Sequence, residues 1–208
     1  MILHGYWRSS AAYRVRIALA WKGIDVTQHA IDLRTGAHHD PEYLLVNPQG
    51  LVPCLVDGPM ALSQSLAIIE YLEETHPNPP LLPADPVGRA RVRAAALAIA
   101  CDIHPVNNMR ILNYLRDELS QPPGAVDSWM HHWIAEGFGP LEAIAGAPYL
   151  FGDRVTLADL CLVPQLYNAR RFAVDLTPYP KLTAIEARLL ALPAFDKARP
   201  ENQPDASQ

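Results

Sequence analysis

A run of prolines divides this sequence into two parts of different character. Five of the eleven residues from His76 to Pro86 are proline, namely Pro77, Pro79, Pro80, Pro83 and Pro86. Proline fixes its own φ angle and lacks a backbone N–H, so neither a helix nor a central strand continues through such a segment. The run therefore predicts a stiff, extended linker. We expect one domain over residues 1–78, the linker over 79–86, and a second domain over 87–208.

Before the linker, the pattern changes every ten to fifteen residues. Aromatic and β-branched runs predict strands over residues 2–7, 26–33, 51–56 and 60–62, and Asp57-Gly58 is a hairpin signal between the last two. Apolar residues at helical spacing predict helices over 14–21 and 65–75. The expected order is β-α-β-(α)-β-β-α, which is typical of a small α/β domain.

After the linker, every periodic segment is helical. We expect a long helix over residues 87–119, bent near His104 because Pro105 removes one backbone hydrogen bond. Further helices are expected over 126–145 and 181–192. Thr156-Leu157-Ala158-Asp159 fits a capping box that opens another helix, and residues 200–208 are expected to fray. The fold class is thus α/β followed by an all-helical domain.

Composition excludes several classes of protein. Half of the 208 residues are apolar, which is too many for a disordered chain. The net charge is −5 and no basic block occurs, so we expect no nucleic-acid partner. The longest apolar runs are shorter than the roughly 20 residues of a membrane span, and residues 1–7 do not resemble a signal peptide.

The cysteines and histidines argue against disulfides and metals. Three cysteines lie far apart along the chain, so we expect reduced, buried thiols and a cytoplasmic protein. The pairs His38-His39 and His131-His132 have no Cys or acidic residue at matching helical spacing, and no metal site is expected.

Three short segments could bind an anionic ligand. Arg8-Ser9-Ser10-Ala11-Ala12 lies where a strand passes into a helix, and free N–H groups at a helix start attract anions, including a thiolate. Val52-Pro53 precedes a strand, and a cis bond there would turn the Val52 backbone toward a ligand. Gln64-Ser65 opens a second helix. Ordinary helix caps and a structural proline explain each segment equally well when it is taken alone.

Together these motifs resemble the zeta class of the glutathione transferases, from about residue 1 to residue 205. The resemblance is carried by the residues from Arg8 to Leu19, by Gln64 to Glu74, by Cys101 to Asn108, by Thr156 to Asp159 and by Asp175 to Pro180. Bacterial members of this class are maleylacetoacetate isomerases and the related maleylpyruvate isomerases. The resemblance implies a thioredoxin-like domain followed by a helical bundle, and a homodimer.

The resemblance also implies glutathione-dependent cis–trans isomerisation of a maleyl dicarboxylate. It assigns the thiol-activating hydroxyl to Ser9, helped by the N–H groups of Ser10 and Ala11. Contacts with glutathione are implied for a larger set: Ser9, His38, Val52, Gln64, Ser65, His104, Asn108 and Arg110. We expect His104 and Asn108, four residues apart, to share one face of the long helix.

Arginines are the expected ligands of the substrate carboxylates, because guanidinium binds a carboxylate through two parallel hydrogen bonds. The candidates are Arg8, Arg171 and Arg110; on an ideal helix, Arg110 lies about 200° round from Asn108 and so ranks third. Surface ion pairs are the plainer interpretation of any one of them. Ala11 stands where many members have cysteine, which excludes a covalent role for that position.

Three other functions remain open at the level of sequence. The substrate could be maleylpyruvate, from gentisate degradation, instead of maleylacetoacetate, from tyrosine and phenylalanine degradation. The chain could also be a transferase acting on α-halo acids. Finally, the chain could be a non-catalytic binding or assembly module, as some domains that resemble glutathione transferases are.

Overall fold

The computed structural model describes residues 1–206, which form two units. The first unit contains residues 1–80 and the chain from Ala191 onward, and the second contains residues 81–190. The boundary at Pro80 falls in the predicted linker. The return of the chain to the first unit after Leu190 differs from the expectation of one helical domain over 87–208.

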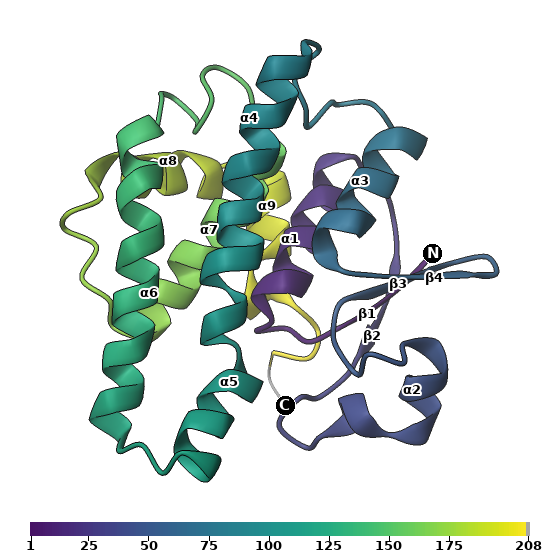
Figure 1. Cartoon of the computed structure of the whole chain (residues 1–208). Helices are drawn as coiled ribbons and strands as arrows, with labels where there is room; N and C mark the ends of the chain where they lie inside the picture. The colour runs from purple at the N-terminus through teal and green to yellow at the C-terminus, as the bar shows by residue number, and fades with distance from the viewer. Residues whose placement is uncertain (207–208) are drawn as a thin grey trace. The chain divides into compact units, whose positions relative to one another are not determined.

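The first unit is built on a four-stranded mixed sheet (Figure 1). Its strands are β1 (Ile2–Gly5), β2 (Thr27–Ala30), β3 (Cys54–Asp57) and β4 (Met60–Ser63). The order across the sheet is β2-β1-β3-β4, with β1 parallel to β2 and antiparallel to β3. This arrangement confirms the predicted order of elements and the thioredoxin-like fold.

Helices cover both sides of this sheet. They are α1 (Ser10–Trp21), α2 (Pro41–Val46), α3 (Ser65–Thr75) and α9 (Pro193–Ala198). Helix α1 packs against α3 and α9, and Figure 1 shows α1 and α3 on one side of the sheet with α2 on the other. Most residues of α1 are buried, because α3 and α9 both pack against this helix.

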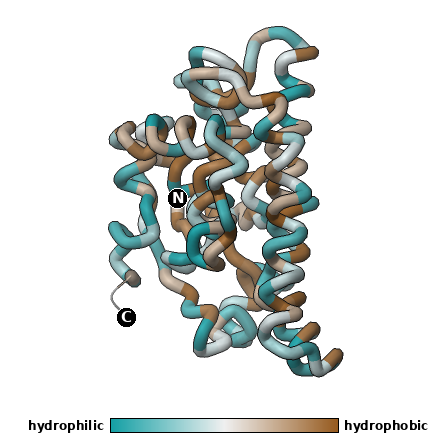
Figure 2. The backbone as a smooth tube through the Cα atoms, turned by 90° about the vertical axis from the view of Figure 1, so that its left-hand side faces the viewer, coloured by the Kyte–Doolittle hydropathy of each residue, from teal (hydrophilic) through white to brown (hydrophobic). Residues whose placement is uncertain are grey.

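The second unit is entirely helical. It contains α4 (Pro86–Leu97), η2 (Ala98–Ile103), η3 (Pro105–Asn107), α5 (Met109–Asn113), η4 (Tyr114–Glu118), α6 (Pro123–Ile144), α7 (Leu157–Arg171) and α8 (Pro180–Leu190). Helix α7 packs against α4 and α8, and its residues from Leu157 to Leu166 are all buried. Figure 2 shows hydrophobic and hydrophilic residues alternating along the helices, as expected for helices with one buried face.

The expected long helix over 87–119 is interrupted. After α4 the chain continues as the π-helical segment η2, then as the 3₁₀ turn η3, and only then as α5. Pro105 begins the 3₁₀ turn, because it cannot donate the hydrogen bond that an α-helix requires there. Gly137 of α6 permits η2 to pack closely, since a Cβ atom at that position would lie 2.2 Å from the Ile103 side chain.

The predicted capping box is present at the start of α7. The Asp159 carboxylate is fully buried and accepts hydrogen bonds from the backbone N–H of Thr156 at 2.8 Å and of Leu150 at 2.9 Å. Burial raises the pKa of Asp159, and these hydrogen bonds oppose the rise. The carboxylate therefore fastens the loop before α7 as well as the helix start.

Two smaller expectations are wrong. The chain after α9 does not fray over residues 200–206: Pro200–Asn202 is a 3₁₀ turn and Gln203 is buried; residues 207–208 lie outside the described part. Cys54 and Cys161 are buried as expected, but Cys101 is exposed. Within residues 1–206, no helix is long and apolar enough to cross a membrane.

Candidate active site

The sheet register brings four candidate segments together where the strands end, at the side of the sheet that holds the C-terminal ends of β1, β2 and β4 and the N-terminal end of β3; this side is called the edge below. His4, near the end of β1, pairs with Cys54 at the start of β3, and Cys54 pairs with Ser63 at the end of β4. Neighbouring strands lie about 4.8 Å apart. The segments that leave the sheet at this edge, which are residues 6–9, 31–39, 52–53 and 64–65, are therefore neighbours.

Ser9 is the N-cap of α1. Its Oγ accepts a hydrogen bond from the Ala12 N–H at 3.2 Å, so the plain interpretation of this serine as a helix cap is correct. The cap leaves the hydroxyl proton and a second lone pair available for a ligand. The first hydrogen bond within the helix runs from the Tyr13 N–H to the Ser9 carbonyl, so the N–H groups of Ser10 and Ala11 precede it.

Ser65 is the first residue of α3 and follows the N-cap Gln64. It is 6% exposed, and its Oγ accepts a hydrogen bond from Arg14 Nη1 at 3.2 Å. The preceding residue, Gln64, has φ +69°, a conformation that costs free energy for any residue other than glycine. Gln64 Nε2 donates to Gln49 Oε1 at 3.1 Å. The protein thus maintains a strained backbone where two polar side chains open a helix.

Val52 and His38 complete the predicted set in this unit. The Val52-Pro53 peptide is cis, as proposed from the sequence. Val52 lies before β3, whose pairing begins at Cys54, so its backbone groups are outside the sheet ladder. His38 lies in the 3₁₀ turn Ala37–His39, where burial and the adjacent His39 lower its pKa. Its ring is therefore neutral near pH 7.

The electrostatics of this edge favour an anion. Neither α1 nor α3 carries an acidic residue in its first turn, so the partial positive charge of each helix start is not offset locally. Arg14, which is 1% exposed, donates a hydrogen bond to the Ser65 hydroxyl. Arg8 follows β1, and its guanidinium lies 5.3 Å from the Trp7 ring centroid. Two helix starts with hydroxyls, together with Arg8, suit a ligand carrying both a thiolate and a carboxylate.

In the second unit, His104 lies on a different element from Asn108 and Arg110. His104 ends the π-helical segment, Asn108 has extended φ and ψ angles and caps α5, and Arg110 lies within α5. The expectation that His104 and Asn108 share one helical face is therefore wrong, because Pro105 begins a 3₁₀ turn between them. The angle expected between Asn108 and Arg110 on an ideal helix does not apply either. Asn108 Oδ1 accepts a hydrogen bond from the Arg110 N–H at 3.2 Å.

Arg171 is the last residue of α7. Its guanidinium lies 4.9 Å from the Phe172 ring centroid, and its side chain is exposed. The neighbouring Arg170 forms an ion pair with Glu186 of α8. Arg170 therefore helps to hold α7 and α8 together.

Sequence reasoning missed two residues that support the site. Arg14 and Gln49 contact Ser65 and Gln64 respectively. An arginine in the apolar part of the predicted helix over 14–21 was the available signal for Arg14, because a charged side chain on a buried face needs a partner. Gln49 stands in a turn and gave no comparable signal.

Comparison with known proteins shows the family of this chain. Residues 3–80 match the N-terminal domain of glutathione S-transferase, and residues 109–188 match the C-terminal domain of glutathione S-transferase. The chain belongs to the glutathione S-transferase family. The segment after residue 188 lies outside both matches.

Three similar proteins are named as maleylacetoacetate or maleylpyruvate isomerases. A probable maleylacetoacetate isomerase of Vibrio cholerae is 52% identical, over 99% of this chain and 98% of its own. The holo structure of a maleylpyruvate isomerase, described as a bacterial zeta-class glutathione S-transferase, is 48% identical with TM-score 0.96. The match covers 99% of this chain and 100% of the other. A maleylacetoacetate isomerase of Anaeromyxobacter dehalogenans, with dicarboxyethyl glutathione and citrate bound in its active site, is 43% identical with TM-score 0.87. The match covers 99% of this chain and 93% of the other.

Proposed function

We propose that this transferase is a glutathione-dependent cis–trans isomerase that converts maleylacetoacetate to fumarylacetoacetate. The observation that carries the proposal is the end of β1, where Arg8 and the Ser9 hydroxyl stand together at the start of α1. This arrangement offers a hydrogen-bond donor for a thiolate on the residue that follows an arginine, whose guanidinium suits a carboxylate.

The described residues fit glutathione, which is a tripeptide with two carboxylates and one thiol. Ser65, Gln64 and the start of α3 suit its γ-glutamyl carboxylate. The Val52 backbone lies outside the ladder and is available to pair with the peptide like an added strand. Ser9 suits the thiol, and His38 is the candidate for the remaining end of the tripeptide.

When bound, glutathione would supply a thiolate for addition to the double bond of a maleyl diacid; after rotation about the resulting single bond, expulsion of the same thiolate would re-form the double bond as the fumaryl isomer and regenerate glutathione. The role of Ser9 is to donate its hydroxyl proton as a hydrogen bond to the sulfur, and the N–H groups of Ser10 and Ala11 add positive potential. Hydrogen bonds to the charged form lower a thiol pKa. The side chain at Ala11 cannot ionise or form a covalent bond, so activation depends on Ser9 and the backbone.

The substrate carries two carboxylates, and the arginines are proposed to bind them. Arg8 and Arg171 are the principal candidates, with Arg110 as a third. His104 and Asn108 are proposed to contact glutathione, as the family resemblance implies. The dicarboxyethyl glutathione in the Anaeromyxobacter relative is a thioether of glutathione with a four-carbon diacid, which supports a thiol and two carboxylates acting at one site in this family.

Maleylpyruvate is the alternative substrate, because one of the similar structures is a maleylpyruvate isomerase. Both compounds are short maleyl diacids with a keto group, so the arginines do not separate them. We place the reaction in the cytoplasm, since Cys54, Cys101 and Cys161 are all free thiols.

We also propose a homodimer. An open groove of about 750 Å³ on the second unit is lined by α4, η2 and α6 and includes the apolar side chains of Trp133, Leu141 and Ile144. Ile144 is 55% exposed. An exposed apolar groove supports a protein partner, and Ile144→Glu is expected to shift sedimentation toward the monomer while leaving the helical content unchanged.

Two substitutions of Ser9 test the proposed reaction. Ser9→Ala removes both the cap and the hydroxyl, whereas glycine is a nearly adequate cap, so Ser9→Gly removes only the hydroxyl. Both variants are expected to lose about a hundredfold in turnover of maleylacetone while retaining glutathione, and only Ser9→Ala should lose about 1 kcal/mol of stability. Unchanged turnover in Ser9→Gly would remove the hydroxyl from the reaction.

A further inference from the structure

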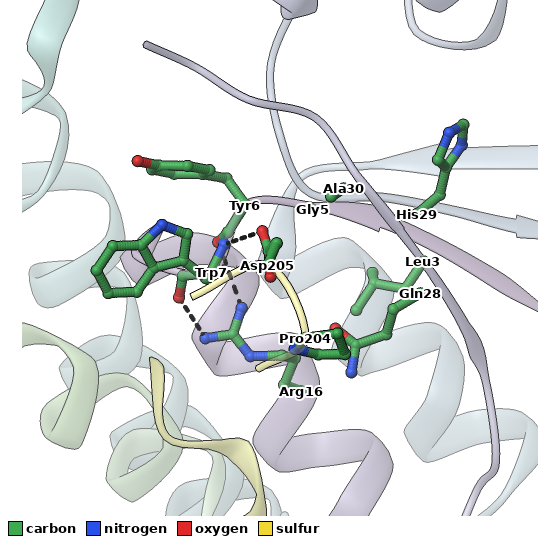
Figure 3. A pocket seen from close by; sticks show the side chains of 10 residues that line it. All are labelled: Leu3, Gly5, Tyr6, Trp7, Arg16, Gln28, His29, Ala30, Pro204 and Asp205. Atoms are coloured by element: carbon green, nitrogen blue, oxygen red, sulfur yellow. Dashed lines mark hydrogen bonds between the residues drawn. The ribbon is translucent and has the colours of Figure 1, made fainter. Parts of the chain in front are cut away.

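The chain segment that follows α9 reaches back to the loop carrying Arg8 and Ser9. Asp205 Oδ2 accepts a hydrogen bond from the Trp7 backbone N–H at 2.9 Å, across 198 residues of sequence. Figure 3 shows this bond at a small pocket of about 50 Å³, which Pro204 and Asp205 line together with Tyr6 and Trp7. Two parts of the chain that are distant in sequence thus share one hydrogen-bonded network.

Arg16 fastens the same loop from α1. Arg16 is 6% exposed, and its guanidinium donates to the Trp7 carbonyl at 2.8 Å and to the Tyr6 carbonyl at 3.4 Å (Figure 3). Its Nε donates to the Ala198 carbonyl at the end of α9, at 3.2 Å. One buried cation therefore joins the β1–α1 loop to the helix that leads into the segment after it.

Gln203 holds this segment in place. Its Nε2 donates to the carbonyls of Lys197 and Arg199 at 3.0 and 2.7 Å, and its Oε1 accepts from Gln28 Nε2 at 3.0 Å. Gln203 is 6% exposed. Asp205 thus follows an anchored residue, Gln203, and its carboxylate is bonded to the Trp7 N–H.

We propose that Asp205 is a positioning residue for the isomerase reaction. The carboxylate fixes the Trp7 N–H while Arg16 fixes the two neighbouring carbonyls. The Ser9 N–H donates to the Tyr6 carbonyl at 2.9 Å, so the same turn sets the position of Ser9. Asp205 therefore acts on the Ser9 hydroxyl and on Arg8 through the backbone and touches neither. The proposal rests on the proposed function for its kinetic consequence but not for the hydrogen bond itself.

The first test needs no variant and no substrate. The Trp7 amide proton of the intact protein is expected to exchange with solvent at least about a hundredfold more slowly than in an unfolded chain, because it is hydrogen-bonded. Exchange at the unfolded rate, measured by NMR, would overturn the proposal whatever the activity of the protein proves to be.

The second test separates positioning from stability. Asp205→Ala is expected to lower kcat/KM for maleylacetone about tenfold, since small displacements of a reacting group are costly, and to raise the thiol pKa of bound glutathione, followed by thiolate absorbance. Asp205→Asn keeps an acceptor oxygen and is expected to recover most of both effects. Equal losses in the two variants, or wild-type values in Asp205→Ala, would contradict the proposal.

Asp196→Ala is the matched control. Asp196 lies in α9 and its exposed carboxylate pairs with Arg199 at 3.1 Å, without contact to the loop. Its removal is expected to leave the thiol pKa and kcat/KM unchanged. If wild-type protein with glutathione fails to isomerise maleylacetone, the proposed function fails, while amide exchange at Trp7 still decides the contact of Asp205.

Discussion

At the scale of single residues, two serine hydroxyls each accept a hydrogen bond from the protein and keep a proton to donate. Ser9 accepts from the Ala12 N–H and Ser65 accepts from Arg14. A hydroxyl has one proton and two lone pairs, so each internal bond orients the oxygen without using the proton. Both residues can therefore serve the helix start and a bound anion together.

Ser65→Ala is expected to raise KM for glutathione about tenfold with little change in kcat, because a hydrogen bond to a charged group contributes about 1.5–3 kcal/mol. The affinity for S-methylglutathione, which lacks the thiol, should fall in parallel in a calorimetric titration. A fall in kcat at unchanged KM would instead connect Ser65 to the reaction at sulfur and contradict the assigned role.

Arg171→Ala is expected to raise KM for the diacid about tenfold, while Arg171→Lys should retain part of the affinity, because lysine keeps the charge but loses the two-pronged geometry. Steady-state kinetics at saturating glutathione measure this directly. The wild-type KM in Arg171→Ala would mean that other residues bind the carboxylates.

At the scale of elements, β1 carries a titratable group in the sheet. His4 is 7% exposed and pairs with Cys54 of β3 and His29 of β2. Burial, and then the charge on His29, lower the pKa of His4 below 6.5. The unfolded chain therefore binds more protons than the folded protein just below that pH, so stability falls as the pH decreases through this window.

The midpoint of thermal unfolding should accordingly decrease between pH 7.5 and pH 5.5. His4→Leu, which replaces the ring with an apolar side chain of similar volume, is expected to make this decrease shallower. An equally steep decrease in that variant would assign the pH dependence to other groups.

The elements also differ in how far sequence could predict them. Residues 65–75 form a helix with the predicted bounds because Ser65 and a regular apolar stripe are both local signals. For the helix over 87–119, Pro105 predicts a bend, whereas the structure has a break; the sequence does not show that η2 packs against Gly137, because Ile103 and Gly137 are more than thirty positions apart. The burial of Gln203 and the bond of Asp205 to Trp7 could not be predicted, since neither leaves a local pattern.

At the scale of the whole molecule, strand register determines which of the predicted segments lie close together. The segments at residues 9, 52 and 64–65 were separate weak signals, and pairing of β1, β3 and β4 brings them to one edge. His104 and Asn108 failed as a helical pair because spacing in sequence places side chains only where the helix is continuous.

Glutathione is expected to stabilise the protein against heat. A ligand that binds only the folded state adds about 2.7 kcal/mol at a concentration one hundred times Kd, and for a chain of this length that corresponds to an increase in Tm of roughly 5–10 °C. S-methylglutathione should act similarly on wild type and Ser9→Gly. No shift in calorimetry with either ligand would contradict a glutathione site.

The most direct test of the central claim follows maleylacetone and glutathione together by proton NMR in the presence of the wild-type protein. The account predicts that the cis olefinic signals are replaced by trans signals only when glutathione is present, and that all the glutathione is recovered unchanged. Isomerisation without glutathione, or glutathione consumed in step with the substrate as a stable thioether, would contradict it.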